Sequence, residues 1–488
     1  MLKTKFRKVC IILIVLAVAF CFSVTASAAE PSAYIYNSFQ GTAPIPDFYL
    51  AETFLRGEDL ACGSFDRPCD LFVDKDGCIY VCDNGNDRIV VLDKSGQLLK
   101  VLETFYDPQT EEETTLYRPN GVFVDEEKNI YIADTESERV LYCDGNGVVL
   151  QQFTKPDIQQ FSEDTQFLPT KVVADAQKNV YVQCEGIYQG LLLFGSDGQF
   201  ITFYGSETVF ASTEVQLSYI WKQLMNQEQR EETSRYVPTE IKSIDIDKNG
   251  YIYTTAQQHS TLGAKNKMDN IRKLNAKGSN VLLNKMPEAA YLAFSNAAVQ
   301  FNMIDIAVDD DGFVTIIDNA LGKIMYFDKE MNLLALFGSV GHTLGEYQIP
   351  SAVDVYGDKM FILDQATNMI TVLNRTEFGQ SVCDAVLTYH RGYYDQTIEP
   401  WEDIVAHSAN YEFAYNYLGN AYLSQGEYQK ALNCFELGRD SVGYNEAYKQ
   451  LRKDDMRNAL TYAVPVLAVV LIVALIVVKV VRSKRKSR

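Results

Sequence analysis

Histidine can take part in more kinds of site chemistry than other residues, because imidazole binds zinc and transfers protons near neutral pH. The four are His259, His342, His390 and His407. No two of them stand at the spacing of a metal-binding pair, and the last two fall in a helical region. The sequence also contains no phosphate-binding glycine loop and no nucleophile elbow. Motifs therefore do not predict an enzyme, and we expect no cofactor and no metal.

Two aspartates are each followed five residues later by an arginine: Asp83 with Arg88, and Asp134 with Arg139. Each aspartate ends an apolar segment, so its carboxylate can accept N–H bonds from the following turn while the arginine braces the neighbouring blade. Because the pair is repeated, we favour this structural role. The alternative is ligand contact, which makes these four residues candidate binding residues.

Three consecutive aspartates, Asp309, Asp310 and Asp311, offer the oxygen ligands that calcium takes. The same place in an earlier copy of the pattern described below holds Asp74 and Asp76. A polar turn between two strands explains both, so the triplet does not predict a calcium site.

Eight of the ten cysteines follow residue 60: Cys62, Cys69, Cys78, Cys82, Cys143, Cys184, Cys383 and Cys434. An even number in an exported chain is compatible with disulfides. However, a chain of this length can bury a core without covalent links, and these cysteines are scattered. We therefore expect mostly free thiols that fill small apolar spaces.

A repeated unit of four strands must position these residues. One copy runs from Arg118 to Tyr142: an apolar strand, a polar turn, a second apolar strand ending in Asp, and a third opened by Arg. Variants recur between residues 65 and 375. Such units stack as blades because none can bury both faces of its sheet alone. The sequence predicts a mostly β protein with a six-bladed propeller over residues 29–382, in which residues 48–56 supply the outer strand of the last blade.

The repeated unit resembles the NHL repeat, whose blades carry comparable Pro-x-Gly, Val-Asp, Tyr-Val-Ala-Asp and Arg-Ile segments. The resemblance covers roughly residues 50–380, although copies three and four lack the Asp and the Arg. It implies a propeller of the type found in extracellular zinc-dependent lyases, which need several histidines near the central channel. Of the histidines, His259 and His342 fall in this region, which argues against a lyase. Six-bladed lactonases, which hold calcium or zinc through carboxylates, have a similar architecture.

A second repeat with a period of 34 follows the propeller. Residues 391–401 match residues 425–435, and this period is typical of tetratricopeptide helical hairpins. We expect such hairpins over residues 383–457, leaning on the propeller or on a partner. They form either a stalk or a docking surface, for which the candidate residues are aromatic: Tyr394, Trp401, Tyr428 and Phe435.

Both ends of the chain are apolar segments with basic flanks. Residues 1–28 have the basic start, apolar stretch and Ala-Ser-Ala end of a secretory signal peptide. Residues 459–481 are long enough to cross a bilayer, with Pro465 in the first turns of that helix. The basic tail, residues 482–488, is expected to stay cytoplasmic, which leaves the bulk of the protein outside the cell membrane.

Charge excludes one class of ligand. Ten of the 44 lysines and arginines lie in the signal segment, at Lys479 or in the tail, so 34 face 64 acidic residues in the remainder. Nucleic acid binding needs a basic face, and the extracellular side lacks nucleic acid partners. We therefore expect no nucleic acid partner.

Four long additions fall on one face of the predicted propeller, at residues 103–117, 206–236, 255–270 and 285–301. Loops on a rigid scaffold commonly carry recognition. The favoured hypothesis is a non-enzymatic, membrane-anchored binding or scaffold protein with a protein partner in the membrane, for which a transport system is a candidate. The alternatives are a cell-surface metal-dependent hydrolase or lactonase, and a glycan or cell-wall binder in which Tyr219 and Trp221 stack on sugars.

Overall fold

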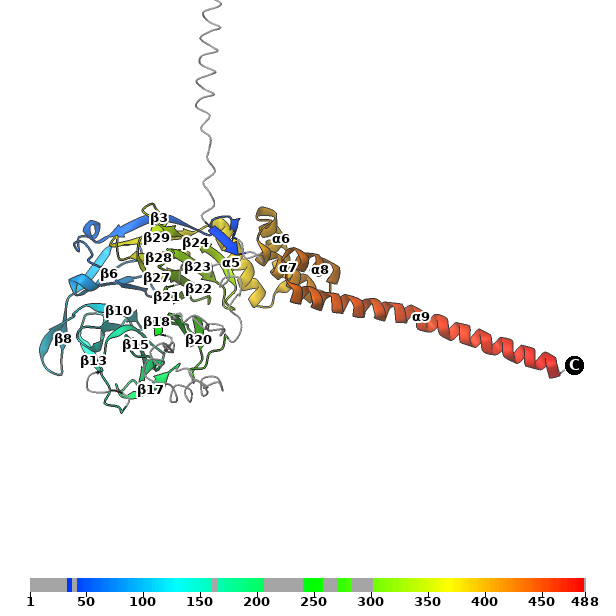
Figure 1. The fold of residues 1–488 in the computed structure, drawn as a ribbon, viewed down its shortest axis with the longest axis horizontal. Coiled ribbons are helices and arrows are strands. Elements are labelled where there is room, and N and C mark those ends of the chain that lie inside the picture. Colours follow the sequence, from blue (N-terminus) through cyan, green and yellow to red (C-terminus); the bar gives the residue numbers. More distant parts are fainter. Residues whose placement is uncertain are drawn as a thin grey trace, which may run out of the picture.

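The computed structural model describes residues 33–36, 42–159, 161, 165–205, 240–257, 271–282 and 302–486. Six antiparallel sheets form one body, from which helices extend to a single long C-terminal helix (Figure 1). The predicted mostly β, six-bladed propeller is confirmed. The proposed signal peptide, residues 1–28, lies outside the described residues.

Blades one to three each contain four strands in sequence order. The strands are β4 (Asp70–Val73), β5 (Ile79–Asp83), β6 (Arg88–Leu92) and β7 (Leu98–Leu102); β10 (Pro119–Val124), β11 (Ile130–Asp134), β12 (Arg139–Cys143) and β13 (Val149–Thr154); β14 (Pro169–Ala174), β15 (Val180–Cys184), β16 (Leu191–Phe194) and β17 (Phe200–Tyr204). The extension after blade one forms a hairpin of β8 (Thr104–Asp107) and β9 (Glu112–Thr115). Most of the other three predicted additions lies outside the described residues.

Blade four has three consecutive strands in the described residues, whereas blades five and six also take up segments that are distant in sequence. Their strands are β18 (Glu240–Ile246), β19 (Ile252–Gln257) and β20 (Ile271–Leu274); β21 (Met303–Val308), β22 (Val314–Asp318), β23 (Lys323–Phe327) and β24 (Leu333–Phe337); β27 (Pro350–Tyr356), β28 (Lys359–Asp364) and β29 (Met369–Arg375). A short parallel pair, β25 (Ser339–Val340) and β26 (Glu346–Tyr347), links blades five and six.

The ring closes through the N-terminal part of the chain, as predicted. Strand β3 (Tyr49–Arg56) pairs antiparallel with β29, from Met369 opposite Arg56 to Arg375 opposite Tyr49. A second contribution was not predicted: β1 (Ala33–Tyr36) and β2 (Thr42–Ile45) extend the outer edge of blade five. Blades five and six therefore both depend on residues that precede the first blade.

Aspartates build the turn between the first two strands of most blades. Asp74 accepts hydrogen bonds from the backbone N–H groups of Asp76 and Cys78, both at 2.9 Å. Gly77 completes the turn at a φ of 84°, where a side chain would be strained. Asp309 caps its own turn in the same way, since it accepts from Asp311 at 3.0 Å and Phe313 at 2.9 Å. The acidic triplet is thus a turn, in agreement with the sequence-based interpretation.

Neighbouring blades are joined at the start of each inner strand. The carbonyl oxygen of Pro119 in blade two accepts from Asn84 of blade one at 3.0 Å, and that of Pro169 in blade three accepts from Thr135 of blade two at 2.6 Å. The carbonyl of Ile241 in blade four accepts from Gln183 at 2.8 Å. In blades two, three and four, one carbonyl near the start of the inner strand therefore receives a side-chain donor from the preceding blade.

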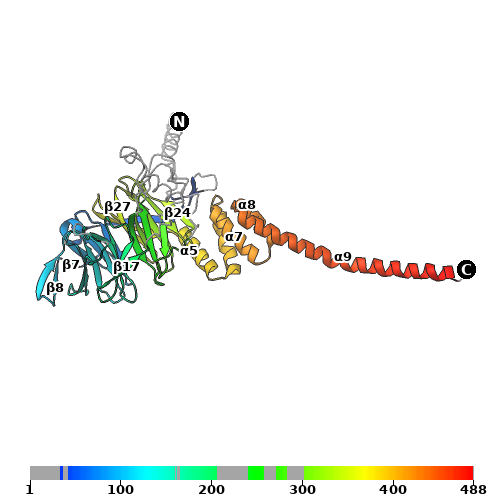
Figure 2. The ribbon, with the colours of Figure 1, turned by 60° about the horizontal axis from the view of Figure 1, so that its bottom comes forward.

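The helical segment follows β29 of blade six and packs against blade five. It comprises α5 (Glu377–His390), η3 (Tyr394–Thr397), α6 (Ile398–His407), α7 (Glu412–Ser424) and α8 (Tyr428–Leu437), which form two helical hairpins (Figure 2). Helix α5 starts before the predicted boundary at residue 383, because Thr376 caps it by accepting from the N–H of Gly379 at 3.1 Å. The Tyr411 hydroxyl donates to the carbonyl oxygen of Leu334 at 2.9 Å, and the Tyr417 hydroxyl donates to Asp328 at 2.7 Å. The hairpins lean on the propeller, as expected.

Helix α9 (Ser441–Lys486) joins the helical segment to the predicted span. The helix is continuous from Ser441 through the predicted span at residues 459–481 (Figure 1). Pro465 therefore lies inside a helix and not in its first turns. Within the described residues, α9 is long and apolar enough to cross a membrane, and its apolar side chains are exposed.

Candidate functional site

The central channel is lined by a cluster of ionisable side chains, of which two are buried and three are partly exposed. The innermost strands β4, β14, β18, β21 and β27 each direct one such side chain into it. These residues are Asp70, Lys171, Asp245, Asp305 and Asp354. Asp70, Lys171 and Asp305 occupy the same place in their strands, four residues before the aspartate of the following turn. Asp245 lies two residues before Asp247, the aspartate of its turn, and Asp354 has the equivalent position on the inner strand of blade six.

Lys171 bridges two blades across the channel. Its Nζ lies 2.5 Å from Asp70 Oδ1 and 2.7 Å from Asp305 Oδ1. Burial disfavours the ammonium ion, but the carboxylates of Asp305 and Asp70 outweigh it and raise the pKa of Lys171. The Ser243 hydroxyl also donates to Asp305 Oδ1, at 2.6 Å. One cation thus offsets the charge of carboxylates from blades one and five.

Each channel aspartate also binds the backbone of the next blade. Asp70 accepts from the N–H of Val122 at 2.9 Å, and Asp305 accepts from that of Val353 at 2.8 Å. Asp245 accepts from the N–H of Val308 at 2.7 Å, and Asp354 accepts from that of Val73 at 2.6 Å. The side chains therefore join blade one to two, four to five, five to six, and six back to one.

Burial changes the protonation of these carboxyl groups. It raises the pKa of Asp70 to about 6 and that of Asp245 to about 7. It also raises the pKa of Asp354 well above its ordinary value. Near neutral pH, the channel therefore combines ionised and protonated carboxyl groups around a single ammonium ion.

The space among these residues is small. The channel cavity has a volume of about 30 Å³. This is enough for one or two water molecules, whereas pockets for organic ligands measure roughly 300–1,000 Å³. The arrangement can hold protons and water, and it locks the blades together. Within the described residues it offers no room for an organic substrate.

Stability is expected to depend on pH through Asp245. A carboxyl whose pKa is raised on folding stabilises the protein fully below the pKa of the unfolded chain, and this contribution is lost as pH rises through the folded value of about 7. Asparagine cannot ionise, so the Asp245→Asn variant does not lose this contribution. As pH rises from 5 to 8, the free energy of unfolding of the variant should therefore increase by about 2–3 kcal/mol relative to that of wild type. Urea unfolding of both proteins at the two pH values measures this difference, and parallel pH profiles would contradict it.

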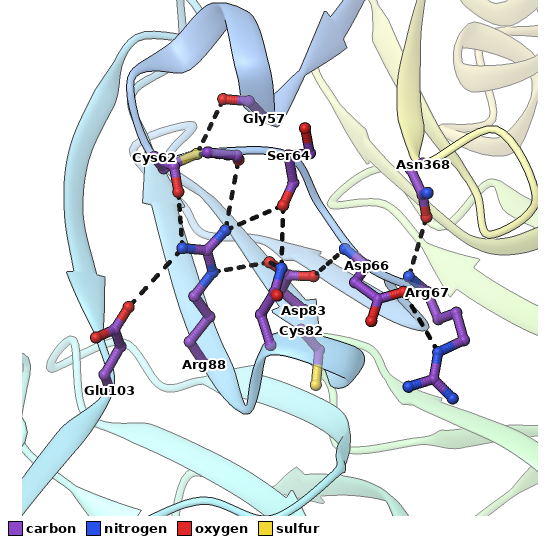
Figure 3. A network of polar contacts seen from close by, with 12 residues as sticks. Gly57, Cys62, Ser64, Asp66, Arg67, Cys82, Asp83, Arg88, Glu103 and Asn368 are labelled. Carbon is purple, nitrogen blue, oxygen red and sulfur yellow. Dashed lines mark hydrogen bonds and ion pairs between the residues drawn. The ribbon is translucent and has the colours of Figure 1, made fainter.

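The Asp83–Arg88 pair braces the chain that enters blade one (Figure 3). Arg88 Nε donates to Asp83 Oδ2 at 2.8 Å, and Nη1 donates to the carbonyl oxygen of Cys62 at 2.7 Å. Asp83 Oδ1 accepts from the N–H of Asp66, also at 2.8 Å. Both side chains are buried, and Asp83 is fully inaccessible to solvent.

The Asp134–Arg139 pair repeats this arrangement in blade two. Arg139 Nε donates to Asp134 Oδ2 at 2.8 Å and Nη2 donates to the carbonyl oxygen of Thr115 at 2.8 Å. Asp134 Oδ1 accepts from the N–H of Tyr117 at 2.7 Å. In both blades, the Asp binds mainly the segment that precedes the first strand of its own blade, rather than the following turn alone. These contacts fit the structural role that the repetition favours.

The histidines are dispersed in the described residues. His342 lies in an exposed loop, where Nδ1 is 2.7 Å from Gln348 Nε2. His390 is buried in the helical segment with Nε2 3.6 Å from Asp328 Oδ2, and His407 is exposed near Asp403. No group of three metal-ligating side chains converges within the part of the chain that the structure describes. His259 falls outside that part.

The candidate docking residues divide into two groups. Trp401 and Phe435 are fully buried, because they pack between the helices and cannot contact a partner without rearrangement. Tyr394 is 38% exposed and Tyr428 is partly exposed. The predicted glycan-binding residues, Tyr219 and Trp221, lie outside the described residues.

An apolar surface at the end of the helical segment was not predicted. Its members, hereafter the α8–α9 surface, are Leu437 at the end of α8 and Val442, Tyr444 and Tyr448 on α9, which are 57%, 78%, 38% and 52% exposed. Beside it lies a groove of about 230 Å³, which is lined by Phe435, Glu436, Arg439, Asp440, Ser441, Tyr444 and Asn445. Tyr444 and Tyr448 stand four residues apart and therefore share one helix face.

No protein-family model matches the sequence. No curated protein matches it either. Among solved structures, it is similar to virginiamycin B lyase from Staphylococcus aureus, with 10% identity, a TM-score of 0.38, and 63% of this chain and 95% of that chain covered.

The structure is also similar to that of a streptogramin B lyase, with 8% identity and a TM-score of 0.39. The match covers 71% of this chain and 99% of the lyase chain. A third match is the extracellular domain of a putative hybrid two-component system from B. thetaiotaomicron, with 12% identity and a TM-score of 0.35. It covers 67% of this chain and 39% of that chain. Identities and scores this low carry no information on activity, so the six-bladed fold rests on the strand order itself.

Proposed function

We propose that this protein is a non-enzymatic, membrane-anchored binding protein that holds a propeller outside the cell and engages a membrane protein through its helical segment. The observation that carries the proposal is the continuous structure that runs from blade six through two helical hairpins, which pack against blade five, into α9. A propeller fixed in this way is held at one distance and orientation from the membrane. A component of a transport system in the membrane is the candidate partner.

The α8–α9 surface supports a protein partner rather than lipid contact. Tyr448 precedes Leu460, where the predicted span becomes continuously apolar, by about 12 residues, or roughly 18 Å of helix at 1.5 Å per residue. Tyr444 lies one turn further from the span. Aromatic side chains at that height stand above the interfacial region and are typical anchors of protein interfaces.

The channel geometry supports a binding role over catalysis. Propeller enzymes of the kind considered from the sequence act at the central mouth. In this chain, Lys171 and four aspartates fill the channel and bind one another or the backbone. The aspartates join blade one to two, four to five, five to six and six to one, and Lys171 links blade three to blades one and five. The geometry therefore gives the hydrolase and lactonase alternatives no support.

Loss of a membrane partner is the expected result of changing the α8–α9 surface. Crosslinking and co-purification of the full-length protein from its native membrane should recover a membrane protein, and Tyr444→Ser/Tyr448→Ser should reduce that recovery at least about tenfold, because buried aromatic anchors contribute 2 kcal/mol or more each. Tyr188→Ser, which changes a propeller tyrosine that is 46% exposed, is the matched control.

Three outcomes would contradict the proposal. Equal recovery from both variants would show that the α8–α9 surface is not the docking site. Equal loss in the Tyr188→Ser control would indicate a nonspecific effect. A stoichiometric calcium or zinc ion in the purified protein, together with hydrolysis of a lactone, would favour an enzyme.

A further inference from the structure

Two cysteines lie side by side at the start of blade one. The inner strands of the other blades begin with a β-bulge, for example between Pro119 and Gly121. Blade one follows the same course: Asp70 is paired with Cys82, and the N–H of Cys69 also donates to the carbonyl oxygen of Cys82, at 3.1 Å. In a bulge, two residues of one strand face a single residue of the other. Cys69 therefore lies beside Cys82.

Both thiols point to the same atom. Cys82 Sγ donates to the carbonyl oxygen of Pro119 at 3.0 Å, and Cys69 Sγ donates to it at 3.3 Å. Cys69 Sγ also lies 3.7 Å from the carbonyl oxygen of Cys82 itself. Burial, together with the neighbouring Cys69 thiol, raises the pKa of Cys82 well above its ordinary value. Two sulfur atoms that lie within 3.3 Å of one oxygen atom need only a small movement to form a bond.

The carbonyl oxygen of Pro119 does not need these thiols. Asn84 Nδ2 also donates to it, at 3.0 Å, so three donors approach an atom with two lone pairs. In the next contact around the ring, Thr135 alone reaches the carbonyl oxygen of Pro169. Loss of both thiol donors would therefore leave the contact between blades one and two satisfied by Asn84.

The pair is specific to blade one. The places of Cys69 in blades two, three and six hold Asn120, Thr170 and Ser351. The residues that pair like Cys82 in blades two and three are Ala133 and Gln183. The repeat therefore does not require a thiol at either place.

We propose that Cys69 and Cys82 are a dithiol site that closes to a disulfide when a small-molecule disulfide reaches the protein. The Cys69 thiolate attacks one sulfur of the small disulfide, forms a mixed disulfide and releases one thiolate. The Cys82 thiolate then attacks the Cys69 sulfur and displaces the second small thiolate. The protein loses two protons and two electrons, and the small disulfide is reduced to two thiols.

Exposure sets the order of these steps. Cys69 is partly exposed, whereas Cys82 is fully buried. The small disulfide therefore reaches Cys69 first. Because burial keeps the Cys82 thiol protonated, we expect the second step to be the slower one. The product would cross-link β4 and β5 beside Asp70 and the contact with blade two, and this role does not depend on membrane anchoring.

Peptide mapping of the full-length protein tests the site. Tryptic peptides 57–75 and 76–88 each hold two cysteines, so the test uses Cys62→Ser/Cys78→Ser protein, in which each holds one. After native incubation with oxidised glutathione, the two peptides should be joined through Cys69 and Cys82, and two thiols per chain should be lost. Reduced glutathione should reverse the link.

A second variant traps the first step. Cys82→Ala in the same background should retain glutathione on Cys69, because no second thiol displaces it. The proposal is overturned if glutathione also persists on Cys69 when Cys82 is present, if both thiols remain free, or if the peptides join only after unfolding in urea. Wild-type protein, mapped by fragmentation of the joined peptides, keeps the test valid should a variant fail to fold.

Discussion

Lys171→Met is expected to lower the free energy of unfolding by about 3–5 kcal/mol, because it removes one partner of a buried ion-pair network. Asp70 and Asp305 would each lose the ammonium group that now lies within 2.7 Å, in a site with almost no exposure to solvent. Methionine has a similar length, so the channel would remain filled and the charge alone would be removed. Urea unfolding of the full-length protein at pH 7, followed by circular dichroism, measures the loss.

Two comparisons identify the cause. Lys178→Met removes a surface ion pair with Glu127 at 2.8 Å, for which we expect a loss of about 1 kcal/mol or less. Combining Lys171→Met with Asp70→Asn and Asp305→Asn should recover part of the stability, because removing a whole buried network costs less than leaving one side unpaired. A Lys171→Met protein as stable as the Lys178→Met control would refute the structural role of the channel network.

Deletion of residues 49–56 is expected to abolish the sharp, cooperative unfolding of the propeller. These residues form β3, which is hydrogen-bonded to β29 along seven paired positions. Without β3, the first and last blades keep side-chain contacts such as Asp354 with the N–H of Val73 but lose the strand pairing that closes the ring. In addition, β29 becomes an exposed edge strand that favours aggregation. Thermal unfolding followed by circular dichroism should show a broad transition at a lower temperature.

The β1–β2 hairpin provides the matched deletion. Removing residues 33–45 leaves blade five with its own four strands, β21 to β24, and leaves the β3–β29 pairing in place. We therefore expect a lower melting temperature but a transition that stays cooperative. A sharp transition at unchanged temperature after deletion of residues 49–56 would show that β3 does not close the ring.

The sequence carries a signal for the channel site that the search for motifs missed, namely charged residues at one position of the inner strands. Asp70, Lys171 and Asp305 each stand four residues before the aspartate that ends the first strand of a blade, where blade two has Gly121. A charged residue at an otherwise small or apolar place of a buried strand is unusual. Spacing along the chain cannot show, however, that Lys171 of blade three meets Asp70 of blade one, because that contact crosses the channel.

The docking residues show the opposite failure. Trp401 and Phe435 were chosen because they are large and aromatic, but such residues also fill the spaces between helices. The structure buries both and exposes Tyr444 and Tyr448 on α9. Periodicity identifies the apolar face of a helix, whereas the neighbour that covers it depends on how α8 and α9 pack.

The sequence by itself determined the local architecture: strand, turn and strand in each copy, the six blades, the strand that closes the ring, the helical hairpins and an apolar helix near the C-terminus. These follow from side-chain periodicity and turn chemistry, which act over a few residues. The tertiary structure alone decided the Lys171 bridge, the pairing of Cys69 with Cys82 and the attachment of the hairpins to blade five. Those contacts join segments that the ring brings together, and their energies come from burial, which no local pattern specifies.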